Sequence, residues 1–233
     1  MARRLRFVVP GVPHHVTQRG NRRTQVFFSD ADRQTYLAWL RVECSQHGVA
    51  ILAYCLMPNH IHLVAVPAER GSLSHMLKEL HMRYAQRLNR LRKLSGHTWQ
   101  GRYFSAALDE QYFWAAMRYV ERNPVEAGLV ERAEDYPWSS ARAHCTGIWD
   151  PVLTTDPNWV DQLNAVHGWA AWLGAGASAN DTATLRHQTA RGLPCGSREF
   201  VEQLERQAGR RLQQGRTGRP RRADKIQQLK RGV

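Results

Sequence analysis

Two apolar runs separated by a short turn constrain the fold of this 233-residue chain more than any other feature. Residues 49–56 and 61–66 are almost entirely apolar, and runs of this length are typical of buried strands. The segment between them, Met57-Pro58-Asn59-His60, contains proline and asparagine, which favour a turn. The sequence therefore predicts a β-hairpin with strands buried in the core.

A pair of histidines lies at the start of the second strand. His60 and His62 are one residue apart, and side chains alternate along a strand, so both imidazoles should point to the same face. They are candidates for half of a divalent-metal site, which needs a third protein ligand and open positions for water or substrate. Taken alone, such a pair is more often two ordinary histidines, and this alternative stays open here.

Periodicity and turn residues predict the other elements of the first 130 residues. Strands are expected at 12–19 and 103–108, and helices at 29–48, at 72–92 and from Asp109 to Asn123. The order is then β-α-β-β-α-β-α. This order predicts an α+β fold, in which an antiparallel-rich sheet carries helices on one face.

The last of these helices offers a third ligand. Tyr119 and Asn123 are four residues apart and share one side of the helix, on the flank of its apolar stripe. The amide oxygen of Asn123 is a candidate ligand for a hard divalent ion, and the Tyr119 hydroxyl would lie near a metal-bound substrate. Pro124 disfavours helical geometry at Asn123, which weighs against the ligand assignment.

Tyr84 is the alternative to Tyr119 as the nucleophile. It lies between Arg83 and Arg87 in the sequence. It lies in an apolar helical stripe, which predicts a place in the core. Leu88, one turn later, cannot bind a metal. Other aromatic residues and histidines are expected to be structural or exposed, although the tryptophans could stack on extruded bases. These are Trp99, Trp114, Trp138, His14, His15, His75 and His81.

The charge of the chain predicts an acidic partner. Lysine and arginine outnumber acidic residues by 33 to 20, which gives a net charge of +13 and an isoelectric point near 10.3. Nucleic acid is favoured over a membrane. The chain has no Cys-x-x-Cys spacing, and its basic start lacks the apolar run of a signal peptide. We therefore expect a cytoplasmic, nucleoid-associated protein with reduced thiols.

The composition changes near residue 150, which predicts a domain at 1–150 and a basic helical extension at 151–233. A helical pattern at 158–173 is followed by a flexible break at 174–179, and a short helix is expected around Leu204. The end of the chain is rich in arginine and is expected to bind DNA, although it could also be a basic end without specificity. The candidate contacts there are Arg216, Arg219, Arg221 and Arg222.

Several segments together resemble the REP-associated tyrosine transposases, which belong to the HUH single-strand nucleases and resemble the single-tyrosine transposases of small insertion sequences. These segments are 57–62, 99–103, 118–129 and 136–140, and the resemblance covers about residues 3–145. It implies a ferredoxin-like HUH nuclease fold, Mg²⁺ or Mn²⁺ on His60 and His62, and attack on a DNA phosphate by a tyrosine of the late helix. It also implies recognition of palindromic hairpins in single-stranded DNA. The insertion-sequence relatives carry glutamine where Asn123 stands.

The expected function is a metal-dependent single-stranded DNA endonuclease and strand transferase that acts as a monomer or homodimer. Tyr119 would form a covalent 5′-phosphotyrosine intermediate, with His60, His62 and Asn123 as metal ligands. Arginines close to the metal site in the sequence would contact the DNA phosphates on either side of the phosphate that reacts. These arginines are Arg102, Arg118 and Arg122. The alternatives are a catalytically silent hairpin-binding protein and a metal phosphoesterase that uses activated water.

Overall fold

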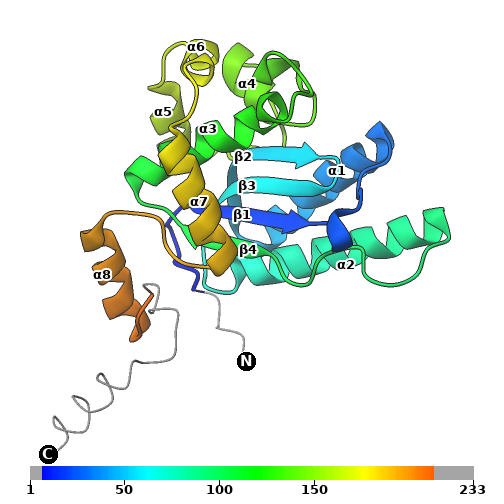
Figure 1. Cartoon of the computed structure of the whole chain (residues 1–233), viewed down its shortest axis with the longest axis horizontal. Coiled ribbons are helices and arrows are strands. Elements are labelled where there is room, and N and C mark those ends of the chain that lie inside the picture. The colour runs from blue at the N-terminus through cyan, green and yellow to red at the C-terminus, as the bar shows by residue number, and fades with distance from the viewer. Residues whose placement is uncertain (1–6, 213–233) are drawn as a thin grey trace, which may run out of the picture.

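The computed structural model describes residues 7–212 and contains a four-stranded antiparallel sheet in the order β2-β3-β1-β4 (Figure 1). The arginines predicted at 216–222 lie outside the described residues. The strands and the first three helices are β1 (His14–Arg19), α1 (Asp30–His47), β2 (Val49–Met57), β3 (His60–Pro67), α2 (Ser72–Arg92), β4 (Phe104–Ala107) and α3 (Glu110–Glu126). Their order and the antiparallel sheet confirm the expected α+β, ferredoxin-like fold.

The ends of α1 follow the local sequence. The Ser29 hydroxyl accepts a hydrogen bond from the backbone of Asp32, whose carboxylate accepts one from the backbone of Ser29, so the two residues form a capping box. Gly48 ends the helix in the left-handed region, with φ of 60°, which glycine adopts without steric cost. These two ends place β2 directly after α1.

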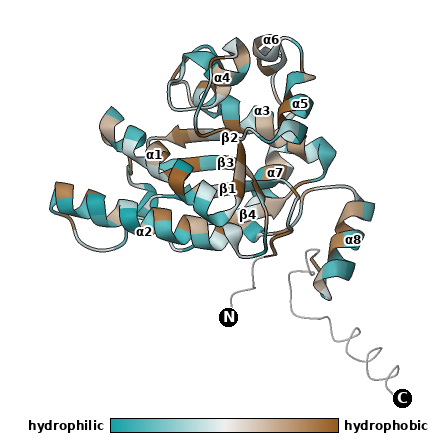
Figure 2. Cartoon of the chain, turned by 180° about the vertical axis from the view of Figure 1, so that it is seen from behind, coloured by the Kyte–Doolittle hydropathy of each residue, from teal (hydrophilic) through white to brown (hydrophobic). Residues whose placement is uncertain are grey.

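Helices cover both faces of the sheet. Ile61 and Leu63 pack with α1 and α2 in one buried cluster. The sequence predicted helices on one face of the sheet, and α1 and α2 cover that face. Val64 packs with α3 in a second cluster. We call the side of the sheet that carries Val64 the α3 face. The strands are covered on both sides because β2 and β3 are apolar at successive positions, and Figure 2 shows these hydrophobic strands between the helices.

Helix α3 continues through Pro124 to Glu126, so the expected loss of helical geometry at Asn123 does not occur. Pro124 removes the hydrogen bond that its own nitrogen would have donated. Both Asn123 and Pro124 are buried, and the backbone N–H of Ala127 still donates to the Asn123 carbonyl at 3.0 Å. Asn123 therefore stays on the same helical side as Tyr119.

The later part of the chain forms short helices that pack on α3 and on the sheet. The helix expected at 158–173 is split, because Gly168 adopts φ of 69° at the start of α6 (Trp169–Gly174). The expected break at 174–179 runs from the last residue of α6 to the first residue of α7 (Ala179–Arg191). The sequence did not predict helix α7. These elements are α4 (Ala141–Thr146), α5 (Pro157–Asn164), α6 (Trp169–Gly174), α7 (Ala179–Arg191) and α8 (Arg198–Ala208). Helix α8 confirms the last predicted helix.

The remaining short elements are two 3-10 helices, η1 (Asn21–Arg23) and η2 (Ala133–Asp135). Helix α7 lies across β4 and against α3 (Figure 1), and its Leu185 is fully buried on the α3 face. Within residues 7–212, no helix combines the length and the apolar character needed to cross a membrane.

Candidate active site

The turn before β3 orients His60. The Nδ1 atom of His60 lies 2.6 Å from Oδ1 of Asn59, and Nδ2 of Asn59 donates to the carbonyl of Arg23 at 3.0 Å. Since the Asn59 oxygen can only accept, His60 carries its proton on Nδ1, and Nε2 keeps its lone pair. Burial lowers the pKa of His60 to about 4, with a smaller contribution from Arg19. His60 is therefore neutral at pH 7.

His62 lies on the α3 face and is buried. Its Nδ1 atom lies 3.0 Å from Nε2 of His15, whereas its Nε2 atom is buried and has no hydrogen-bond partner among the described residues. Burial, followed by the neighbouring His60 and His15, holds the pKa of His62 well below 6.5. An unpartnered buried imidazole nitrogen with a free lone pair is a suitable metal ligand.

His15 was expected to be structural or exposed, and it is buried in direct contact with His62. The two imidazole rings stack with their centroids 5.2 Å apart. On its other side, His15 Nδ1 lies 2.8 Å from the hydroxyl of Thr189. Burial lowers the pKa of His15 to about 3. The pairing of β1 with β3 could have suggested this contact, since Thr17 lies opposite His62 and His15 shares the face of Thr17.

Tyr119 lies beside the histidines. Its ring centroid is 5.2 Å from that of His62 and 5.6 Å from that of His15. Its hydroxyl accepts a hydrogen bond from Nε of Arg186 at 3.1 Å. One turn later, the carboxamide of Asn123 lies close enough to His60 to favour its protonated form and so raise its pKa. The structure thus brings together all four residues that were predicted as ligands and nucleophile.

Tyr84 lies in the cluster on the opposite side of the sheet from His62. Its side chain is fully buried, and its hydroxyl donates to the carbonyl of Val26 at 2.7 Å. The prediction that Tyr84 belongs to the core is therefore confirmed. Trp99 is also buried in this cluster, whereas Trp114 is partly buried on the α3 face and contacts the rings of Trp169 and Trp172.

The donor set at the site fits a hard divalent cation. It consists of the two imidazoles of His60 and His62 and the carboxamide of Asn123, and borderline or hard cations accept such nitrogen and oxygen ligands. No cluster of three or more histidine, cysteine or acidic side chains suited to a metal occurs among residues 7–212.

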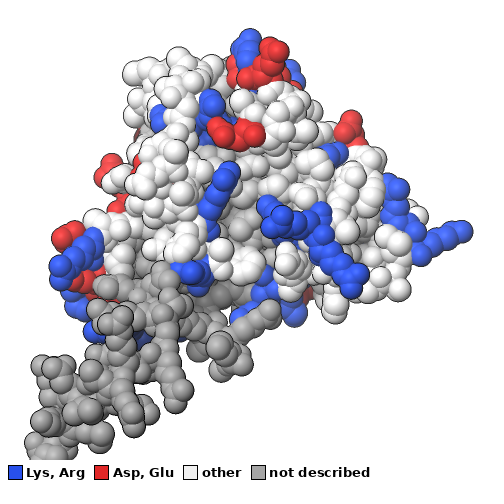
Figure 3. Space-filling view, viewed as in Figure 1, with Lys and Arg blue, Asp and Glu red and all other residues white. Residues whose placement is uncertain are grey.

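Basic side chains surround this end of the sheet. Arg19 lies opposite His60 in the β1–β3 pairing, and the backbone of Gln100 donates to the carbonyl of Arg19, so the loop that carries Arg102 lies at the same end. Exposed arginines follow at 22 and 23. Figure 3 shows basic side chains grouped across the middle of this face, with most acidic side chains away from them.

Two of the predicted phosphate contacts are instead directed at α6. The guanidinium carbon of Arg118 lies 4.1 Å from the ring centroid of Trp172, and Arg122 donates to the carbonyl of Leu173 at 2.6 Å. Arg122 also pairs with Glu126 at 3.5 Å. Arg118 directly precedes Tyr119 and Arg122 directly precedes Asn123, but both guanidinium groups contact α6. Their contacts favour anchoring of α6 over DNA binding, whereas Arg102 stays exposed near the site.

Comparison with known proteins agrees with this geometry. Residues 9–123 match the model of the IS200-like transposases, and the matched segment runs from just before β1 to Asn123 and contains His60, His62 and Tyr119. This segment resembles the IS200-like transposase family. The match ends before α4 to α8, although residues of α4 to α7 pack in the same buried cluster as α3.

The resemblance to REP-associated tyrosine transposases is also confirmed. A protein of Haemophilus influenzae whose name assigns it to this group is 25% identical over 129 residues, which cover 51% of this chain and 73% of that protein. A solved structure described as a REP-associated tyrosine transposase bound to a REP hairpin superposes with a TM-score of 0.52 at 21% identity. It covers 67% of this chain and 93% of the solved one, and supports the fold.

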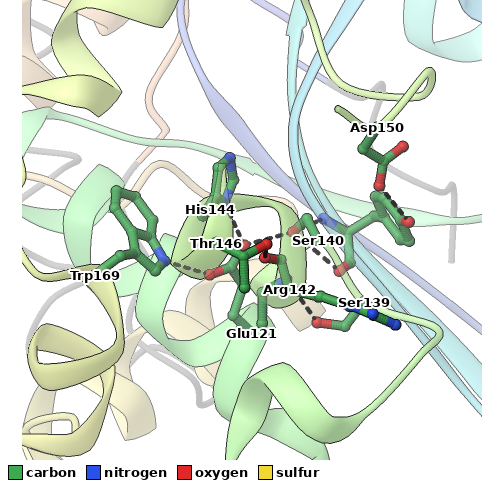
Figure 4. A network of polar contacts seen from close by, with 10 residues as sticks. Glu121, Ser139, Ser140, Arg142, His144, Thr146, Asp150 and Trp169 are labelled. Carbon is green, nitrogen blue, oxygen red and sulfur yellow. Dashed lines mark hydrogen bonds and ion pairs between the residues drawn. The ribbon is translucent and has the colours of Figure 1, made fainter. Parts of the chain in front are cut away.

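A buried carboxylate, two residues after Tyr119, holds helix α3 in place. Glu121 is fully buried and accepts hydrogen bonds from Trp169 at 2.7 Å and Ser140 at 2.5 Å. His144 lies 2.6 Å from the same carboxylate. Figure 4 shows these side chains converging on Glu121. The network ties α3 to α4 and α6, and thereby supports the position of Tyr119.

We expect this network to make stability depend on pH. Burial lowers the pKa of His144, but the charge and hydrogen bond of Glu121 raise it more, so the net pKa lies above 6.5. Protonated His144 therefore contributes stability that is complete below pH 6.5 and is lost as the pH rises through the folded-state pKa. The difference in unfolding free energy between wild type and His144→Gln should shrink as the pH rises above 6.5 and through the folded-state pKa. A difference that grows with pH would contradict this assignment, and exposed His75→Gln serves as the control.

Proposed function

We propose that the protein is a metal-dependent endonuclease and strand transferase that acts on hairpin or palindromic repeat DNA in single strands. One observation carries the proposal: Tyr119 lies beside His62, whose buried Nε2 atom has no hydrogen-bond partner among residues 7–212, and one helical turn from Asn123, which lies close to His60. A nucleophile and a set of metal ligands thus share one site. This arrangement is the one expected for attack by tyrosine on a phosphodiester.

His60, His62 and Asn123 would hold Mg²⁺ or Mn²⁺. When bound, such a cation draws negative charge from the phosphoryl oxygens and favours attack on phosphorus. The protein prepares both histidines to bind a cation. Both are neutral at pH 7, and hydrogen bonds with Asn59 and His15 orient the rings of His60 and His62. Hydrogen bonds to the second ring nitrogen commonly orient ligand histidines in this way.

The proposed step is a transesterification. The Tyr119 oxygen attacks phosphorus, so a bond forms between Oη and phosphorus while the bond from phosphorus to the 3′ oxygen breaks. The tyrosine proton passes to solvent, and the 3′ oxygen takes up a proton and becomes a hydroxyl. The product is a 5′-phosphotyrosine ester. Because this ester keeps a phosphodiester bond, a 3′ hydroxyl can reverse the step and join strands without ATP.

The proposed partner is single-stranded DNA that folds into a hairpin. The related solved structure is described as bound to a REP hairpin, and the net charge of +13 suits a polyanion. Exposed arginines near His60, including Arg22, Arg23 and Arg102, would contact phosphates. Arginines at 216–222 would extend this contact. Because the substrate is DNA, we place the protein in the cytoplasm.

Replacing Arg102 with alanine should weaken hairpin binding and reduce the slope of log K against log salt concentration by about 0.7 to 1, because one phosphate contact is lost. Fluorescence anisotropy over a salt series measures both quantities. Arg198→Ala is the matched control, since Arg198 is exposed in α8 and pairs with Glu202. An Arg102 variant with an unchanged slope would place Arg102 outside the DNA interface.

Incubation with labelled hairpin DNA and Mn²⁺, followed by denaturing gels, tests the function. Wild type and Tyr84→Phe should form a covalent adduct, and Tyr119→Phe should form none. Cleavage without an adduct would instead support the phosphoesterase that uses water. Binding without cleavage, over a panel of hairpins, would support the catalytically silent binder.

A further inference from the structure

Helix α7 reaches the candidate site through two residues one turn apart. Arg186 donates from Nε to the Tyr119 hydroxyl at 3.1 Å, and the hydroxyl of Thr189 lies 2.8 Å from Nδ1 of His15. Residues three apart in a helix share one face. The family match ends at residue 123, so α7 lies outside the transposase domain in sequence.

We propose that α7 is part of the catalytic centre, where Arg186 holds the Tyr119 oxygen and the phosphate that it attacks, and Thr189 fixes the His15–His62 pair for metal binding. This inference rests on the proposed function. It assigns one catalytic residue and one positioning residue to a helix outside the segment that matches the family model.

The chain holds α7 firmly in this position. Leu185 is fully buried, and Thr189 is 1% exposed. The segment after α7 pairs with the end of β4, because the backbone of Cys195 donates to the carbonyl of Ala107 at 2.8 Å and accepts from the backbone of Asp109 at 3.0 Å. Asp109 also caps α3. One short segment therefore ties α7 to the helix that carries the nucleophile, which is the support that a precise site needs.

Arg186 is placed to contact both the nucleophile and the phosphate. Its guanidinium carbon lies 5.1 Å from the centre of the Tyr119 ring, and the residue as a whole is exposed. A guanidinium has five N–H donors in a planar fork, and Tyr119 uses one of them. The remaining donors are free to bind phosphoryl oxygens in pairs. Once the bond between Oη and phosphorus forms, Arg186 lies beside the bridging oxygen of the phosphotyrosine.

Thr189 fixes the tautomers of two histidines. For Nε2 of His62 to offer a lone pair, its proton must lie on Nδ1 and be donated to Nε2 of His15. His15 must then carry its own proton on Nδ1, where the hydroxyl oxygen of Thr189 accepts it. The opposite arrangement would put a proton on Nε2 of His62, which has no acceptor nearby. Thr189 thus acts through His15 on the orientation of His62.

Single-turnover adduct formation in the full-length chain, at saturating hairpin and Mn²⁺, tests Arg186. We expect Arg186→Gln to slow this step by about 10²–10³-fold, the usual effect of removing a donor aimed at the reacting oxygens, with a much smaller change in the Kd for the hairpin. Arg186→Lys should recover part of the rate, because it keeps the charge but loses the fork. Arg191→Gln removes the same charge from the same helix and should react as wild type. A wild-type rate in Arg186→Gln would overturn this assignment.

Mn²⁺ binding to the DNA-free chain, followed by electron paramagnetic resonance, tests Thr189. Thr189→Val should weaken Mn²⁺ binding by about 10- to 100-fold, and Thr189→Ser should restore it by returning the acceptor. Wild-type affinity in Thr189→Val would overturn the positioning role. If Arg186→Gln and Thr189→Val behave as wild type while wild type binds Mn²⁺ and forms the adduct, only the assignment of α7 to the catalytic centre is rejected. A wild-type chain that neither binds Mn²⁺ nor forms an adduct would reject the proposed function as well.

Discussion

Replacement of His62 with glutamine is expected to lower Mn²⁺-dependent hairpin cleavage by about 10²–10⁴-fold, because the site loses one of its two imidazole ligands and with it several kcal/mol of transition-state stabilisation. Glutamine keeps much of the side-chain volume next to His15. Initial rates of cleavage and the affinity for Mn²⁺ should fall together. Hairpin binding in the absence of Mn²⁺ should change little, since arginines carry that contact.

His75→Gln provides the matched control for His62, because His75 is exposed on α2, the helix that packs on the other side of the sheet. It should cleave and bind Mn²⁺ as wild type does. A His62→Gln variant that keeps its Mn²⁺ affinity and cleaves at the wild-type rate would remove His62 from the metal site. The unpartnered Nε2 atom would then need another explanation.

Replacement of Glu121 with alanine is expected to lower the unfolding free energy by about 3–5 kcal/mol, the cost of breaking a buried ion pair by removing one partner. The substitution leaves His144, Ser140 and Trp169 buried without their common acceptor. Chemical denaturation measures the loss. Because α3 carries Tyr119, the variant should also lose activity near its lowered melting temperature.

The control for Glu121 lies on the same helix. Glu126 is exposed and pairs with Arg122 at the surface, so Glu126→Ala should change stability by about 0.5 kcal/mol or less. Equal losses in the two variants would show that the buried network contributes no more than a surface pair. That result would contradict its role in holding α3.

The sequence predicts the parts of the site that depend on local pattern. The apolar hairpin places His60 and His62 on one face of a strand, and the spacing of Tyr119 and Asn123 places both on one side of a helix. Both placements follow from the side-chain periodicity of a strand and of a helix. The pairing of the two elements across the α3 face brings the four residues together. The resemblance to a known family predicted this pairing, whereas periodicity alone does not.

Contacts between distant segments could not be predicted in the same way. Thr189 and Arg186 lie in a helix with few apolar residues, and they reach the site only because Leu185 and the strand-like pairing of Cys195 bring α7 onto the sheet. Arg118 shows the reverse case. It precedes Tyr119 by one residue, but the helical turn directs it to Trp172. Proximity in sequence therefore does not reveal where this arginine points, and only the tertiary packing shows its contact with Trp172.

The most direct test of the account is to find which residue becomes attached to DNA. After reaction with hairpin DNA and Mn²⁺, nuclease trimming and trypsin digestion, mass spectrometry should detect a nucleotide on the peptide Tyr119-Val120-Glu121-Arg122, which trypsin releases after Arg118. The corresponding peptide of the rival, Tyr84-Ala85-Gln86-Arg87, should remain unmodified. A nucleotide on the Tyr84 peptide, or cleaved DNA with no modified peptide, would contradict the proposed tyrosine mechanism.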